Sequence, residues 1–382
     1  MPSAALSRRQ LVLFVLFVLG AAAFMYLVLP RVAGVGQTIH SLGNADVAWL
    51  IGAVVLEVCS FGGYVVLFRT VFAPESERID LVTSYQIALA GLAATRLFAA
   101  AGAGGIALTA WALRRAGLGR RLVAARMLTF LVLLYFFFGA VLLVCGVGLW
   151  AGLLGGGGPT LLTLIPALIA AGAFALTAAA TLVPRDLERR LAHLSAGGGP
   201  LSRWTARVVA VPPLAAGGVR AAWAMVRARE IGLLGAGAWW AFDIAVLWAS
   251  FKAFNAPPPP PAVLAMSYFV GMLGNLLPLP GGLGGVEGGM IGALVAFGTP
   301  LSSALVAVLA YRAISFWLPT IPGVIAYLHL RRTVGRWRQD ERPPRRTGRF
   351  TRPARCYAIQ NEVTALEAAD AKVAAGTTDI AA

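Results

Sequence analysis

The stretch PLPGGLGGVEGG at 278–289 decides the fold, because proline and glycine interrupt an apolar run that covers 262–298. A second apolar run, 81–112, is interrupted near its middle by FAAAGAGGIA at 98–107. Each run is too long for one plain membrane helix of about 20 residues. Proline inside such a run removes a helical hydrogen bond, and glycine permits a tight reversal. Each run therefore predicts a helix, a break and a second helix.

Composition places these two breaks in a polytopic membrane protein. The chain has 382 residues, of which 59% are hydrophobic and 13% are charged, against roughly 25% charged in soluble domains. A soluble fold could not bury that much apolar surface, which excludes a cytosolic enzyme and a secreted disulfide scaffold. Six further apolar runs predict full membrane spans: 11–29, about 47–68, 127–153, 160–183, 231–254 and 302–330. The first is longer than the apolar core of a signal peptide, so we expect it to be an uncleaved span.

The distribution of positive charge along the chain indicates how it crosses the membrane. The net charge is +16, and 27 of the 32 Lys and Arg residues fall in five polar stretches: 8–9, 69–78, 114–126, 185–229 and 331–355. If both interrupted runs crossed the membrane, 13 of these arginines would lie outside, against the positive-inside rule. If both dip in and return, every basic stretch and both termini lie inside. We therefore predict two re-entrant hairpins, and no nucleic-acid partner.

The two interrupted runs also resemble each other. A shift of 180 residues aligns Gly91 with Gly271, Leu97 with Leu277, Gly102 with Gly282, and Gly104 and Gly105 with Gly284 and Gly285. Three spans separate the runs, so the second hairpin has the opposite orientation. The predicted fold class is an all-α polytopic membrane protein with six full transmembrane helices and two oppositely oriented re-entrant hairpins. An inverted repeat of this kind is typical of transporters, with the substrate site near the midplane.

Ionisable side chains inside a membrane are costly and are candidates for function. Five lie in the apolar runs: Glu57, Arg96, Asp243, Glu287 and Arg312. Glu287 follows the second break and Arg312 lies about ten residues into the last span, so we expect these two to pair. The alternative is a salt bridge with a purely structural role. Asp243 lies among tryptophans and is expected to face a water-filled groove, whereas the sequence suggests no partner for Glu57.

The second break suggests an anion site. Pro278 and Pro280 end the incoming helix, and Gly281, Gly282, Gly284 and Gly285 permit the reversal. The returning helix would present free N–H groups that attract an anion such as a lipid phosphate. Glu287 in the same turn would repel that anion unless it is protonated or paired. It would otherwise suit a cationic head group or a coupling proton, and the sequence leaves these choices open.

Motifs of enzymatic chemistry are missing from the sequence. There is no P-loop, and GAGG at 102–105 follows a helix-like run rather than a strand, which argues against a dinucleotide site. The three histidines are isolated, and the three cysteines lack metal or disulfide spacing. We therefore expect no enzyme activity, no cofactor and no metal.

Two polar regions flank the apolar core on the predicted cytoplasmic side. The loop 184–230 interleaves Trp204, Trp223 and eight arginines with apolar residues, which suits either helices on an anionic leaflet or a solvated loop. The predicted domains are a membrane domain, 1–330, and a tail, 331–382, that is basic, then Ala-rich and disordered.

The segment NLLPLPGGLGGVEGGMIGAL at 275–294 resembles the signature of flippase-like proteins related to the transmembrane domain of lysylphosphatidylglycerol synthases. Its matching positions are Asn275, Pro278, Pro280, Gly281, Gly282, Gly284 and Glu287. The segment 91–118 looks like the weaker first-half element, with alanines where a proline and a polar residue are common. The resemblance covers roughly 8–330. It implies a stand-alone bacterial inner-membrane protein that moves lipids or lipid-linked head groups, without the aminoacyl-transferase domain of the fused enzymes.

The combined interpretation is translocation of a polar lipid through a groove. The expected substrate-binding residues are Arg96, Asp243, Asn275, Gly281, Gly282, Gly284, Glu287 and Arg312. The expected partners are membrane lipids and, through the basic loops, the anionic inner leaflet. Two alternatives stay open: a non-transporting scaffold for a lipid or glycan synthase, and a proton-coupled carrier of small solutes.

Overall fold

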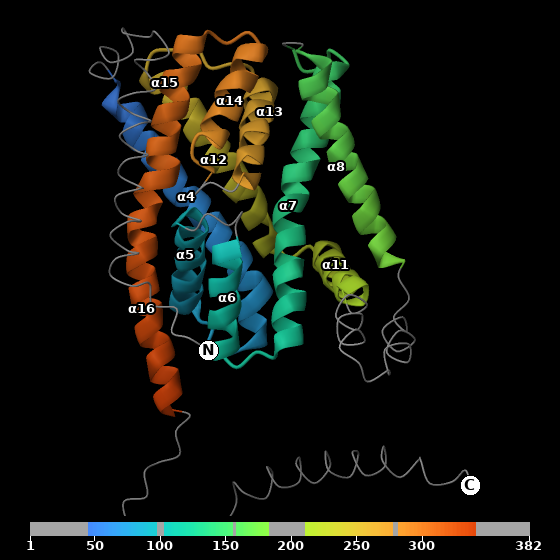
Figure 1. Cartoon of the computed structure of the whole chain (residues 1–382), viewed down its shortest axis with the longest axis vertical. Coiled ribbons are helices and arrows are strands. Elements are labelled where there is room, and N and C mark those ends of the chain that lie inside the picture. The colour runs from blue at the N-terminus through green and yellow to red at the C-terminus, as the bar shows by residue number, and fades with distance from the viewer. Residues whose placement is uncertain (1–44, 98–102, 156–157, 183–210, 278–281, 341–382) are drawn as a thin grey trace, which may run out of the picture. The chain divides into compact units, whose positions relative to one another are not determined.

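A computed structural model of the chain describes residues 45–97, 103–155, 158–182, 211–277 and 282–340 (Figure 1). Within these ranges all regular structure is helical. The helices are α4 (Val47–Phe72), α5 (Leu81–Leu97), α6 (Ala103–Arg115), α7 (Arg120–Trp150), α8 (Thr160–Thr181), α11 (Val211–Arg227), α12 (Leu234–Ala253), α13 (Pro261–Met272), α14 (Gly285–Ala296), α15 (Leu301–Arg312) and α16 (Leu318–Asp340).

Five helical segments in the described part of the chain are long and apolar enough to cross a membrane. They are Val47–Glu75, Arg120–Trp150, Thr160–Thr181, Ile231–Ala253 and Leu301–Trp337. They correspond to five of the six predicted spans, while the predicted span 11–29 lies outside the described residues. The chain is therefore a polytopic, helical membrane protein, as its composition predicts.

Each interrupted run forms two helices that pack side by side (Figure 1). In the first pair, α5 and α6, a Cβ added to Gly91 would lie 2.9 Å from Thr109 Oγ1. In the second pair, α13 and α14, a Cβ added to Gly289 would lie 3.2 Å from Gly271 Cα. Small residues thus bring both pairs into close contact. The shift of 180 residues that relates the two runs in the sequence also relates these two contacts.

The two helix pairs begin and end at opposite ends of the bundle. Ser76, which precedes α5, donates its hydroxyl to the Ala116 carbonyl just after α6, at 3.0 Å. This end also holds the ion pair between Glu75 and Arg126 of α7. At the other end, the Asp46 N–H donates to the Ala253 carbonyl at 2.7 Å, joining the start of α4 to the end of α12. The chain from α12 runs from there into α13 (Figure 1).

The last predicted span, 302–330, is not one uninterrupted α-helix. Residues Ala313–Trp317 form a π-helical turn between α15 and α16. Pro319 has no N–H to donate to the carbonyl four residues earlier, which favours a wider turn here. In this turn the Phe316 carbonyl accepts hydrogen bonds from Thr320 Oγ1 at 2.6 Å and from Arg96 at 3.4 Å. The π-helical turn thus directs a backbone acceptor toward α5.

Two helices extend beyond the apolar runs that predicted them. α7 begins at Arg120 rather than near residue 127, and α16 continues to Asp340 rather than to about 330. The added turns carry arginines, whose long side chains reach polar surroundings while the backbone stays helical. The chain divides into a unit that ends at Trp337 and a second unit, Arg338–Ala382, of which the structure describes only the end of α16.

Candidate functional site

The five ionisable side chains of the apolar runs come from five different helices and form one cluster. Glu57 of α4 interacts electrostatically with Asp243 of α12 and with Arg96 of α5. Arg96 also interacts with Arg312 of α15, which pairs with Glu287 of α14. Four of the five are buried, with exposed fractions of 2% for Glu57, 7% for Asp243, 1% for Glu287 and 5% for Arg312. Arg96 is half-buried.

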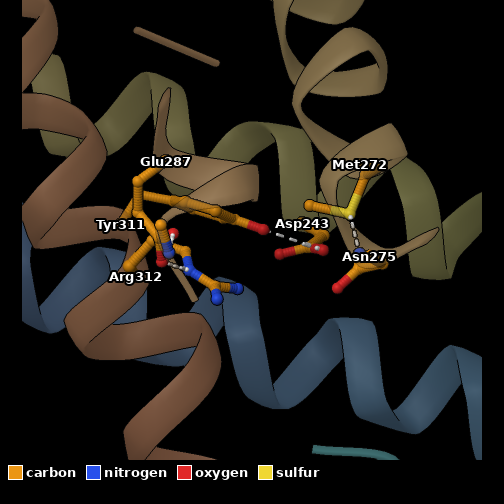
Figure 2. A network of polar contacts seen from close by, with 7 residues as sticks. Asp243, Met272, Asn275, Glu287, Tyr311 and Arg312 are labelled. Carbon is orange, nitrogen blue, oxygen red and sulfur yellow. Dashed lines mark hydrogen bonds and ion pairs between the residues drawn. The ribbon is translucent and has the colours of Figure 1, made fainter. Parts of the chain in front are cut away.

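The predicted contact between Glu287 and Arg312 is present (Figure 2). Arg312 Nε donates to Glu287 Oε1, and the Arg312 guanidinium lies 4.5 Å from the centre of the Phe316 ring. The other carboxylate oxygen, Glu287 Oε2, accepts the N–H of Gly284 at 2.6 Å. The start of α14, where the sequence suggested an anion, is therefore occupied by a carboxylate of the protein itself. This position favours a side chain that carries negative charge.

Asp243 lies under two tyrosines, and the water-filled groove expected beside it stays a prediction. Its Oδ2 accepts the hydroxyl of Tyr268 from α13 and that of Tyr311 from α15, the latter at 3.3 Å. Figure 2 shows the Tyr311 hydroxyl directed at Asp243, with the Glu287–Arg312 pair on one side and Asn275 on the other. Both tyrosines are at most 1% exposed. A buried tyrosine hydroxyl normally finds a partner, and here both share one carboxylate oxygen.

Two buried carboxylate oxygens have no hydrogen-bond partner among the described residues. They are Glu57 Oε2 and Asp243 Oδ1. Their carboxyl groups are close enough to hydrogen bond to each other if one is protonated. Glu57, for which the sequence suggested no partner, thus belongs to the cluster through Asp243 and Arg96.

Arg96 occupies the last turn of α5, next to the first break. Its guanidinium donates to the Phe316 carbonyl and lies 5.5 Å and 5.8 Å from the ring centres of Phe61 and Phe316. Planar stacking on aromatic rings is a typical environment of arginine and orients its hydrogen-bond donors. The cluster therefore contains one guanidinium that is ordered but only half-buried.

The residues of the second break shape a turn. Gly282 and Gly284 have φ of 65° and 83°, a conformation that residues with a Cβ rarely adopt. Asn275 is exposed, donates its side-chain amide to Met272 Sδ at 3.4 Å, and lies beside Gly282. Gly281 lies outside the described residues. The backbone conformation of the turn thus accounts for Gly282 and Gly284. The neighbours of Asn275 described here, Met272 and Gly282, are not members of the charged cluster.

The family described as "Lysylphosphatidylglycerol synthase TM region" matches residues 4–323. The chain belongs to this family. The matched range contains both helix pairs and all five residues of the charged cluster, and it confirms the resemblance found at 275–294.

Two curated relatives match shorter parts of the chain. Both are described as "UPF0104 membrane protein" and come from the archaeon Methanothermobacter thermautotrophicus. One is 36% identical over 86 residues, 22% of this chain and 26% of the relative. The other is 36% identical over 91 residues, 24% of this chain and 26% of the relative. The matched part spans about a quarter of the length of these relatives.

Proposed function

We propose that this protein translocates a polar lipid between the two leaflets of a membrane, and that the charged cluster is the site through which the head group passes. The observation that carries this proposal is the convergence of five ionisable side chains from five apolar helices. Burying such groups in a membrane protein is costly, and they commonly mark the path of a polar substrate. Membership of a family named for the membrane region of a lipid synthase agrees with a lipid substrate.

The two helix pairs provide the access route. Their helices have 17, 13, 12 and 12 residues, short of the about 20 needed for a full span. Each pair accordingly enters and leaves on one side of the membrane, α5–α6 on the basic, cytoplasmic side and α13–α14 on the other. Such inverted pairs meet near the midplane in transporters. The opposite ends at which the pairs begin, and their related glycine contacts, support this arrangement.

Arg96 is the residue proposed to bind the lipid phosphate. Its planar guanidinium matches phosphate oxygens in a bidentate geometry, and it is half-buried beside the first break. Glu287 and Arg312 hold the second turn in place, while Asn275, Gly282 and Gly284 line the passage. Asp243 holds the hydroxyl groups of Tyr268 and Tyr311 at the centre of the cluster.

The basic end of the bundle is proposed to contact the anionic leaflet. In α11 the side chain of Trp223 is 46% exposed, and Arg227 stacks on its ring at 5.5 Å. A helix with a large aromatic and arginines on one face suits the boundary between acyl chains and anionic head groups. This contact would orient the protein with α5–α6 toward the cytoplasm.

The test is leaflet exchange of head-group-labelled anionic phospholipid in proteoliposomes. Arg96→Gln is expected to slow exchange by about tenfold or more, because a charge-assisted hydrogen bond is worth about 1.5–3 kcal/mol. Arg96→Lys, which keeps the charge but loses the planar donors, should fall between wild type and Arg96→Gln. Arg115→Gln, at an exposed position near the end of α6, serves as the control. Exchange no faster than in empty liposomes, or unchanged in Arg96→Gln, would contradict the proposal and favour a small-solute carrier or a scaffold.

A further inference from the structure

Counted over the residues that the structure describes, the charged cluster is one positive charge short of balance. It contains three carboxyl groups, on Glu57, Asp243 and Glu287, and two guanidinium groups, on Arg96 and Arg312. With all five ionised, one negative charge would remain uncompensated among buried apolar helices. An unpaired buried charge costs several kcal/mol. A single proton on one carboxyl group brings the sum to zero.

The hydrogen bonds indicate which carboxyl group carries that proton. Glu287 accepts from Arg312 and from the Gly284 N–H, and Asp243 Oδ2 accepts from Tyr268 and Tyr311, so both carboxyl groups have hydrogen-bond donors that stabilise a negative charge. Glu57 Oε2 and Asp243 Oδ1 are left without a donor among the described residues. A proton on Glu57 Oε2, donated to Asp243 Oδ1, satisfies both oxygens with one hydrogen bond.

We propose that Glu57 and Asp243 together hold one exchangeable proton at neutral pH, and that this proton is the ion coupled to transport. The second half rests on the function proposed above, whereas the first half does not. The charged and titratable groups that face the pair are Arg96 from α5, Tyr268 from α13, and Tyr311 and Arg312 from α15, with Glu287 of α14 behind Arg312. From α7, the aromatic rings of Phe130 and Phe138 pack against α4 and α12.

Release of the proton would couple the pair to the lipid. When Glu57 loses its proton to water, two adjacent carboxylates face the Arg96 guanidinium and compete with a lipid phosphate for it. When Glu57 is protonated, the pair carries a single negative charge, and Arg96 is the cation that an anionic head group can approach. Proton binding and binding of an anionic lipid therefore favour each other, as linkage requires of coupled sites.

Infrared spectroscopy of the purified protein tests the proton site directly. Wild type is expected to show the C=O stretch of a protonated carboxylic acid at neutral pH, and Glu57→Gln should lose it. The glutamine amide can still donate to Asp243, so this variant should fold. Glu230→Gln, at an exposed position after α11, should keep the band. A wild-type spectrum without the band, or a band that survives in Glu57→Gln, overturns the proposal.

Two further measurements separate the outcomes. If the pair binds Na⁺ instead, Na⁺ will raise the melting temperature of wild type and the protonated band will be absent, which also overturns the proposal.

The second measurement is lipid exchange with and without a pH gradient. Exchange that responds to the gradient in wild type but not in Glu57→Gln supports coupling. A band without such a response keeps the proton site and refutes coupling. A band without any lipid exchange refutes the proposed function and the coupling that rests on it, and keeps the proton site.

Discussion

Gly63 of α4 and Gly235 of α12 bring the backbones of two membrane-length helices into contact. A Cβ added to Gly63 would lie 2.7 Å from the Gly235 carbonyl oxygen, and one added to Gly235 would lie closer still to the Gly63 carbonyl. Next to this crossing, the Ser60 hydroxyl donates to the Trp239 carbonyl at 2.8 Å. Glu57 and Asp243 lie about 9 and 12 Å along their antiparallel helices from the crossing. The crossing thus sets the two carboxyl groups at a similar level.

Replacement of Gly63 by alanine should therefore destabilise the protein. The added methyl group meets backbone atoms that cannot move aside easily, and overpacking of this kind costs about 1–3 kcal/mol. Gly62 is the matched control, because a Cβ there meets nothing within 4 Å. Gly62→Ala should be neutral or slightly stabilising, since alanine favours the helix by about 1 kcal/mol. The measurement is the melting temperature of each purified variant in detergent, and equal shifts for both would contradict the close crossing.

The turn before α14 predicts a second pair of variants with different outcomes. Gly284 has a φ of 83°, and a Cβ there would meet nothing within 4 Å. Any loss of stability in Gly284→Ala must then come from the backbone, at about 1–2 kcal/mol for a left-handed residue. Gly288→Ala lies one turn further along the helix, where a Cβ also meets nothing within 4 Å, and should not destabilise. Thermal melting checks this, and a Gly284→Ala variant as stable as Gly288→Ala would refute the strain.

A third prediction concerns pH and the start of α5. Asp80 Oδ1 accepts the Thr83 N–H at 2.7 Å, and this hydrogen bond holds the pKa of Asp80 below its usual value. Because the folded pKa is lowered, the stabilisation is present above the ordinary pKa and is lost as the pH falls through the lowered one. Asp80→Ala should lose about 0.5–2 kcal/mol at neutral pH, and this difference from wild type should shrink in acid.

Asp80→Asn provides the control for that measurement. Its side-chain oxygen still accepts the Thr83 N–H but does not titrate, so most of the stability should remain. Chemical or thermal unfolding as a function of pH distinguishes the three proteins. A difference between wild type and Asp80→Ala that stays constant into acid would show that the carboxylate charge does not contribute.

Much of the charged cluster could be predicted from the sequence because its members are conspicuous there. Ionisable residues are rare in apolar runs, and the cost of burying them forces pairing, which led to Glu287 and Arg312. The pairing of Glu57 with Asp243 depends on the close crossing of α4 and α12, which hydropathy does not contain. Tyr268 and Tyr311 were missed because tyrosine is ordinary in membrane helices, and its role here appears only from the carboxylate it contacts.

In the fold as well, features set by local composition could be predicted, and features that depend on contacts between helices could not. Hydropathy and glycine placement predicted five of the described spans and both helix pairs, because these follow from local composition. Hydropathy did not predict the starts and ends of helices that carry arginines, as at Arg120 and after Leu330, since an arginine side chain can reach water from a helical backbone. The π-helical turn at Ala313–Trp317 was also not predicted. Its role is to offer the Phe316 carbonyl to Arg96, and that contact is made across the bundle.

The Glu287–Arg312 pair can be tested for a role beyond structure. Removing either charge alone, as Glu287→Gln or Arg312→Gln, should cost about 3–5 kcal/mol of stability, because the other buried charge loses this ion-pair partner. The double variant leaves no unpaired charge at this contact, so it should be more stable than the sum of the single effects suggests. Arg331→Gln, at an exposed position of α16, is the control and should melt like wild type.

Lipid exchange by the double variant then separates the two roles of the pair. If the salt bridge is purely structural, lipid exchange by the double variant should recover together with its stability. A role in transport predicts that exchange stays low after stability recovers, because the double variant lacks the Arg312 guanidinium, whose charge acts on Arg96 and Asp243. Melting temperature and exchange rate measured on the same preparations decide between these outcomes, and a double variant that recovers both would assign Glu287 and Arg312 to holding the second turn alone.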